Sequence, residues 1–174
     1  MKIVLILLGF ALISTTNIYA QKEIKPKLSK IESLFKKGEL IEAKEISDVS
    51  ISYEKTMDNP KTWYLRGLIY MALDTSASMV GVTNDALKTS ISSFIKSDAL
   101  IEDKSNELFI ADDYGYPTTK TQQIESYWGF YYNKAATAFG EKDFVEAITS
   151  FNNAALIKPN DTNSVINAGY AAVQ

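Results

Sequence analysis

Apolar positions recur at helical spacing through residues 131–159, which carry the clearest pattern in the chain. Ala147, Phe151 and Ala154 stand at i, i+4 and i+7, so all three lie on one face of an expected helix. Pro159 ends this helix, because the proline ring does not fit a helix interior. In the segment before this helix, the small residues Ala135, Ala136 and Ala138 stand among aromatic residues. The pattern therefore predicts two antiparallel helices joined by a tight turn.

The same spacing predicts further helices on both sides of this pair. We expect them at 26–37, 40–53, from 60 onward, at 84–101, from 121 through 139, and from 162 to the end. Residues able to cap a helix stand just before four of the expected helices: Asn59, Thr119, Asp143 and Asp161. Polar stretches at 75–83 and 104–120 interrupt the pattern. In the second, we expect one short helical turn near 107–110. We expect Tyr114 and Tyr116 to pack against the helices, and the alternative is that they form a binding loop.

Two of these helical patterns resemble the tetratricopeptide repeat. Trp63, Gly67 and Tyr70 stand at i, i+4 and i+7, like the bulky, small and aromatic residues of that repeat's first helix. The helix around Phe151, with Pro159 after it, resembles the second helix. Asn133 and Asn167 are 34 residues apart, which is the period of that repeat.

The resemblance implies an all-α fold, a right-handed stack of antiparallel helical hairpins that forms an α-solenoid. The domain would cover 24–174, with units at about 26–57, 60–103 and 121–159 and a partial unit at 161–174. A two-helix unit cannot bury its own apolar face, so about three stacked units are needed for stability.

The first twenty residues have the order of a secretory signal peptide. Lys2 is followed by an apolar run at 3–13, then by polar residues, and a small residue, Ala20, precedes the expected cut. Such a short run cannot span about 30 Å of hydrocarbon, so we expect no transmembrane segment once 1–20 is removed. The alternative is a buried N-terminal helix. The signal predicts an exported protein, periplasmic or associated with the cell envelope.

Composition narrows the chemistry that this chain can perform. Its 174 residues contain no Cys and no His, and the net charge is −3. Without Cys there is no disulfide and no lipoprotein anchor, and without His the commonest general base and metal ligand are absent. No basic patch indicates nucleic acid as a partner. We find no nucleotide loop or activated nucleophile, and Asp112 and Asp113 lack the ligand spacing of a calcium loop. We therefore expect no enzyme, no cofactor and no metal site.

Tetratricopeptide arrays bind peptides or partner helices on a concave face made mostly by the first helix of each unit. The resemblance places a set of contact residues on that face: Tyr64, Leu65, Leu68, Met71, Tyr132, Asn133, Ala136, Phe139, Ile166, Asn167 and Tyr170. The alternative is that Leu65, Leu68 and Phe139 are ordinary core residues between units.

The expected function is thus a non-catalytic scaffold of the bacterial cell envelope that holds a protein or peptide on its concave face. One alternative is a glycan- or nutrient-capture component at the outer membrane. Another is self-association through the C-terminal helix, which would expose Ala168, Ala172 and Val173.

Overall fold

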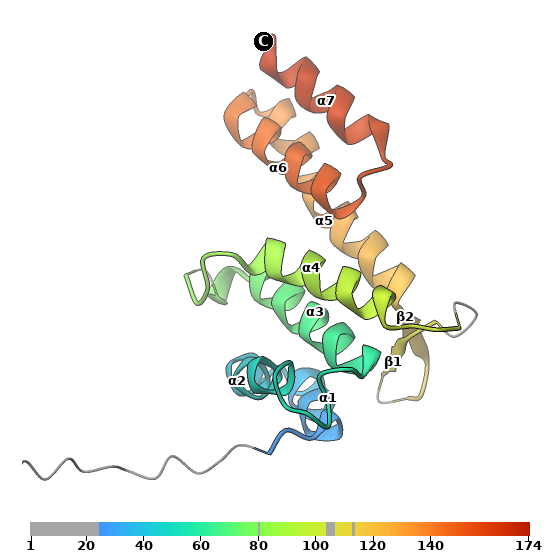
Figure 1. Cartoon of the computed structure of the whole chain (residues 1–174). Helices are drawn as coiled ribbons and strands as arrows, with labels where there is room; N and C mark the ends of the chain where they lie inside the picture. Colours follow the sequence, from blue (N-terminus) through green and yellow to red (C-terminus); the bar gives the residue numbers. More distant parts are fainter. Residues whose placement is uncertain (1–24, 80, 104–106, 113) are drawn as a thin grey trace, which may run out of the picture.

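The chain is mostly helical, as the sequence predicts (Figure 1). The computed structural model describes residues 25–79, 81–103, 107–112 and 114–174, so the predicted signal peptide at 1–20 lies outside the described residues. Seven α-helices are described: α1 Leu28–Lys36, α2 Leu40–Ser50, α3 Pro60–Thr75, α4 Ala86–Ala99, α5 Lys120–Gly140, α6 Phe144–Ile157 and α7 Thr162–Ala172. A short 3-10 helix, η1 (Ala77–Met79), and two strands, β1 (Phe109–Ala111) and β2 (Pro117–Thr119), complete the described elements.

Most helices that follow one another in the sequence are neighbours in space, but α4 and α5 are not among the closely packed pairs. The closest pairs are α3 with α4, α5 with α6, and α6 with α7, and α1 packs on α2 and α3. Figure 1 shows α1 and α2 at one end of the molecule and α7 at the other, with the long helix α5 rising between them. Helix α5 therefore connects the N-terminal helices to the C-terminal ones.

The predicted capping residues hold the helix starts where the sequence places them. The four side chains accept backbone N–H groups as follows: Asn59 from Lys61, Thr119 from Gln122, Asp143 from Glu146 and Asp161 from Ser164. Thr119 and Gln122 form a reciprocal capping box. Between α1 and α2, Gly38 takes a φ of 74°, a left-handed conformation in which a side chain would be strained.

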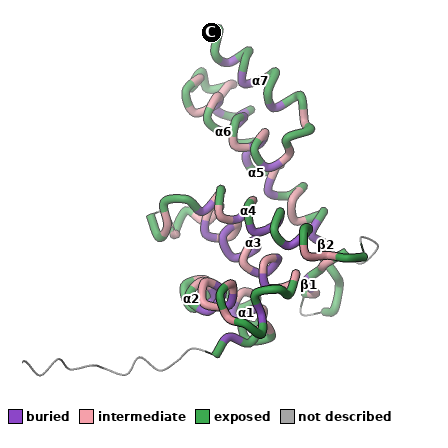
Figure 2. Tube along the Cα trace, in the orientation of Figure 1, coloured by how far each residue is buried: buried purple, intermediate pink, exposed green. Residues whose placement is uncertain are grey.

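Buried side chains form two cores and a junction between them. The N-terminal core lies among α1 to α4 and includes Ile31, Ile46, Leu65, Leu68 and Phe94. The C-terminal core lies among α5, α6 and α7 and consists of Ala135, Ala138, Ala147, Phe151, Ala168 and Ala171. The junction consists of Tyr127, Tyr131, Ala154 and Ile157. Figure 2 shows the buried positions on the inward sides of the helices. Phe151 and Ala154 are buried, which confirms the predicted face of α6.

Helices α3 and α4 approach each other closely at Gly67. A Cβ atom added there would lie 2.5 Å from a ring carbon of Phe94. The Ser90 hydroxyl donates a 2.8 Å hydrogen bond to the Gly67 carbonyl oxygen across the same contact. Because Gly67 has no side chain, the backbone of α3 can lie directly against the Phe94 ring of α4.

The connection before α5 contains strands where the sequence analysis expected a helical turn, so that prediction was wrong. Strands β1 and β2 pair antiparallel, with Ile110 opposite Thr118. Ile110 is buried in the N-terminal core, and the burial of its side chain holds the extended segment in place. Tertiary packing thus determines the conformation of a segment that is too short to show a periodicity of its own.

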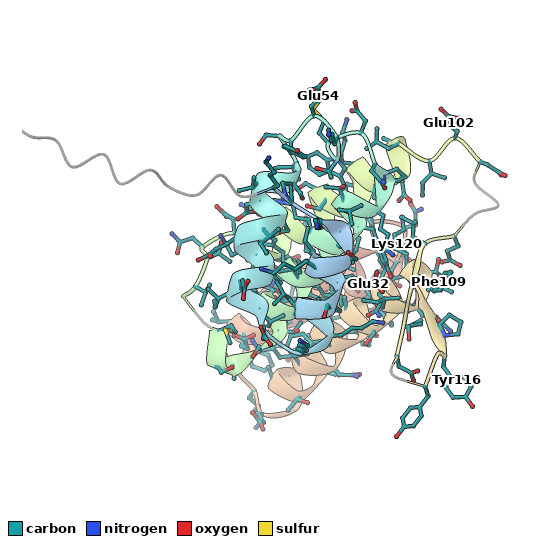
Figure 3. All side chains as sticks on the ribbon, turned by 90° about the horizontal axis from the view of Figure 1, so that it is seen from below. Glu32, Glu54, Glu102, Phe109, Tyr116 and Lys120 are labelled. Atoms are coloured by element: carbon teal, nitrogen blue, oxygen red, sulfur yellow. The ribbon has the colours of Figure 1, made fainter. Side chains whose placement is uncertain are left out.

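The tip of this hairpin exposes two tyrosines that were expected to pack. The Asp112 side chain accepts backbone N–H groups of both Tyr114 and Tyr116 at 2.9 Å, which closes the turn. The two tyrosines are 89% and 72% exposed, so the expected packing was wrong. Figure 3 shows Tyr116 pointing away from the helices. Asp113, the other carboxylate considered for calcium, lies outside the described residues.

Candidate functional site

A groove opens between α5 and α7, with α6 beneath it. Its volume is about 380 Å³, and seven residues line it: Tyr132, Ala136, Phe139, Phe151, Asn167, Tyr170 and Gln174. We call this set the α5–α7 groove. Five of its members belong to the contact face predicted from the sequence. The structure therefore brings these five residues together at one concave site.

Helical register explains why these side chains converge. On α5, residues 132, 136 and 139 stand at i, i+4 and i+7. On α7 and just beyond its end, residues 167, 170 and 174 stand at i, i+3 and i+7, a spacing that also keeps them on one helix face. The Phe151 ring rises from α6 and contacts the Tyr132 ring edge to face, with 5.4 Å between ring centroids. Apolar side chains thus form the floor, and polar tips stand at the sides.

One hydrogen bond crosses the groove and organises its polar groups. The Asn167 side-chain amide nitrogen donates to the Tyr132 hydroxyl oxygen at 2.8 Å. This arrangement leaves the Tyr132 hydroxyl hydrogen as a donor and the Asn167 side-chain oxygen as an acceptor. None of the seven lining residues is charged. The groove therefore presents an adjacent donor and acceptor beside an apolar surface.

Polar contacts beside the groove fasten the start of α7 to α5. The Trp128 indole N–H donates to Asp161 at 3.1 Å and to the Ser164 hydroxyl oxygen at 3.2 Å. The Lys158 ammonium lies 4.8 Å from the centre of a Trp128 ring, within cation–π range. The hydroxyl of Ser164 donates to Asp161 and is the main cause of its lowered pKa. The carboxylate stays ionised, so the cap and the anchor to α5 persist at neutral pH.

The other predicted contact residues lie elsewhere. Tyr64, Leu65 and Leu68 are fully buried in the N-terminal core, so the prediction that they contact a partner was wrong. The reason is that α3 packs against α1, α2, α4 and α5, which leaves it no free concave face. Met71 is half-buried, between the N-terminal core and the junction.

Two more predicted residues are exposed without lining the groove. Asn133 is exposed on α5 beside Tyr132, and Ile166 is 51% exposed on α7. Conversely, the sequence analysis treated Phe151 only as a core residue and did not single out Gln174, yet both line the groove. The position of Gln174 seven residues after Asn167 was a readable signal, because residues spaced by seven share a helix face.

Comparison with known proteins identifies no relative: no family model, no curated protein and no solved structure matches the chain significantly. Within the described ranges, no group of three or more Asp and Glu residues is arranged to hold a metal ion. In the same part of the chain, no helix has the length and apolar character needed to cross a bilayer.

Proposed function

We propose that this chain is a non-catalytic scaffold that binds an extended segment of a partner protein or peptide in the α5–α7 groove. The observation that carries the proposal is the groove itself, with an apolar floor and a hydrogen-bond donor and acceptor available side by side. Grooves that bind ligands combine apolar walls with a few placed polar groups in this way.

The chemistry of the groove favours a peptide group as the ligand. A backbone carbonyl oxygen can accept from the Tyr132 hydroxyl, while the neighbouring N–H donates to the Asn167 side-chain oxygen. An apolar side chain of the ligand would then cover Phe139 and Phe151. Because no lining side chain is charged, the side chains of the groove offer no ion pair to a terminal carboxylate or ammonium. An internal apolar residue of an extended chain therefore fits better than a chain end.

The wider setting is also part of this proposal. We infer a tetratricopeptide-like, right-handed stack of hairpins, which is supported by the pairing of consecutive helices and by the spacing between Asn133 and Asn167. The order of residues in 1–20 supports export to the periplasm or cell envelope. In that compartment the groove would capture a segment of an envelope protein.

Selection from a phage-displayed library of random peptides on the full chain tests the proposal. We expect enriched peptides with a shared apolar residue. Tyr170→Ala should weaken their binding about tenfold, because tyrosine is enriched among the interface residues whose truncation costs more than about 1 kcal/mol. Val165→Ala is the matched control, since Val165 lies on the same helix, is 58% exposed and does not line the groove.

The outcome separates this function from its alternatives. If no peptide is enriched, or if Tyr170→Ala binds selected peptides as the parent does, the proposal fails. Binding of an oligosaccharide in calorimetry, lost in Tyr170→Ala, would instead support the glycan-capture alternative.

A second candidate function is self-association through the outward face of α7. This helix carries no charged residue, and Val165 and Val173 on it or at its end are 58% and 77% exposed. Two copies of an acidic chain could meet there without like charges facing each other. Ala168, expected to be exposed, is buried against α6, so it is removed from this surface. A mass from light scattering that stays monomeric as concentration rises would refute this candidate.

A further inference from the structure

Helix α5 belongs to both halves of the molecule, and a glycine stands at its middle. Its first half packs on the N-terminal core through Ile124, and its second half enters the C-terminal core through Ala135 and Ala138. Gly129 lies between these two regions along α5.

Neither packing nor backbone conformation requires glycine at this position. A Cβ atom added at Gly129 would meet nothing within 4 Å, in contrast to Gly67, where it would meet the Phe94 ring. The φ angle of Gly129 is also not positive, so its backbone conformation is open to other residues. Glycine is less favourable than alanine inside a helix, because it loses more conformational freedom on folding. The residue weakens α5 at this point without any compensating contact.

The first half of α5 borders an open pocket through Ile124 and Tyr127. This pocket of about 220 Å³ lies between α4 and α6, and its walls include Ile91 and Ile95 from α4 and Leu156 from α6. Ile95 and Leu156 are 64% and 50% exposed, so this part of the pocket is open to solvent, whereas Leu87 and Ile91 of α4 pack against the junction that contains Ala154 and Ile157 of α6.

A polar tie joins α5 to α3 on either side of the glycine in sequence. One carboxylate oxygen of Asp74, near the end of α3, accepts hydrogen bonds from both the Tyr127 and Tyr131 hydroxyls at 2.6 Å. These tyrosines stand two residues before and two residues after Gly129. The tie therefore holds α5 to the N-terminal half at the same level as the weakest point of the helix.

We propose that α5 bends at Gly129, so that α6, α7 and the groove they form swing as one unit relative to α1–α4. The pocket between α4 and α6 widens and narrows with this motion, and the bonds to Asp74 limit its range. Glycine has more backbone freedom than any other residue, so Gly129 is the position at which α5 bends most readily. The proposal concerns the motion of the two halves, and it holds whether or not the groove binds a peptide.

Spin-label distance measurements on the full chain test the hinge directly. Since the sequence has no Cys, Glu45→Cys on α2 and Asn152→Cys on α6 introduce two unique labelling sites, both exposed. We expect a broad distance distribution between the labels in the parent chain. Gly129→Ala should narrow it by more than the difference between repeat measurements.

Gly169→Ala is the matched control, because Gly169 lies in α7 and an added Cβ there also meets nothing within 4 Å. Both alanine variants should raise the melting temperature by about 2–4 °C, since each removes a glycine from a helix. Only Gly129→Ala should change the distance distribution. Equal widths in the parent and in Gly129→Ala, or equal narrowing by Gly169→Ala, would overturn the proposal.

Discussion

Replacing Gly67 by alanine is the most direct test of how α3 and α4 pack. The new methyl carbon would lie 2.5 Å and 2.6 Å from two ring carbons of Phe94. Favourable carbon–carbon contacts are about 3.5–4.0 Å long, so the ring or a whole helix must move by about 1 Å. Phe94 is only 4% exposed, and its rigid ring lies within the N-terminal core.

The balance of effects predicts a loss of stability. Alanine favours the helix over glycine by about 1 kcal/mol. Overpacking a well-filled core costs about 1–3 kcal/mol. If the helices separate, the hydrogen bond from Ser90 to the Gly67 carbonyl oxygen is weakened as well, at about 1 kcal/mol. We expect a net loss of about 1–3 kcal/mol in the free energy of unfolding.

Urea unfolding followed by circular dichroism measures this loss through the midpoint, with the slope checked for constancy. The melting temperature should fall by about 2–4 °C for each kcal/mol lost. Gly169→Ala should raise the free energy of unfolding, because an added Cβ there meets nothing within 4 Å. Phe94→Leu in the Gly67→Ala background should recover part of the loss. Equal stability of Gly67→Ala and Gly169→Ala would refute the packing argument.

Three further predictions follow from other parts of the chain. Burial, reinforced by the bonds to Asp74, raises the pKa of Tyr127 and Tyr131, so the unfolded state loses these protons first. The free energy of unfolding should therefore fall above about pH 10, by about 1.4 kcal/mol per pH unit for each tyrosine. Urea midpoints from pH 8 to pH 11 should show a shallower fall when both are phenylalanine. Asn59→Ala should lower the free energy of unfolding by about 1 kcal/mol, because a cap hydrogen bond is lost. Asp85→Ala, at a position without a cap hydrogen bond, should lower it little. Equal urea midpoints of the two variants would contradict this prediction. Mass spectrometry of chain exported by a bacterial host should show cleavage after Ala20, and an intact N-terminus would contradict the signal.

Local chemistry explains why much of the helical structure was predictable. The caps at Asn59, Thr119 and Asp161 depend on a side chain and a backbone N–H two or three residues away, so the sequence contains both partners. The groove was partly predictable for a related reason. Its α5 and α7 residues follow helical register within each helix, and only the pairing of the two helices had to be added.

The wrong predictions concern α3 and the hairpin, whose environment depends on how many other elements pack against them. One free face was expected on α3, but Tyr64, Leu65, Tyr70 and Leu73 lie on all sides of this helix, and each is at most 4% exposed. A helix that is apolar on all sides is usually buried on all sides, so the signal was present but not used. The hairpin was harder, because its three-residue strands are held by the burial of Ile110 in a core formed by distant helices.

The sharing of α5 between the two cores has a consequence for how the molecule unfolds. Tyr132 contributes to both the C-terminal core and the junction, while Ile124 contributes to the junction and the N-terminal core. If either half unfolds, α5 loses packing contacts, and the other half packs on the same helix. We therefore expect cooperative loss of structure in one transition, and a protease cut within α5 should release both halves to degradation together.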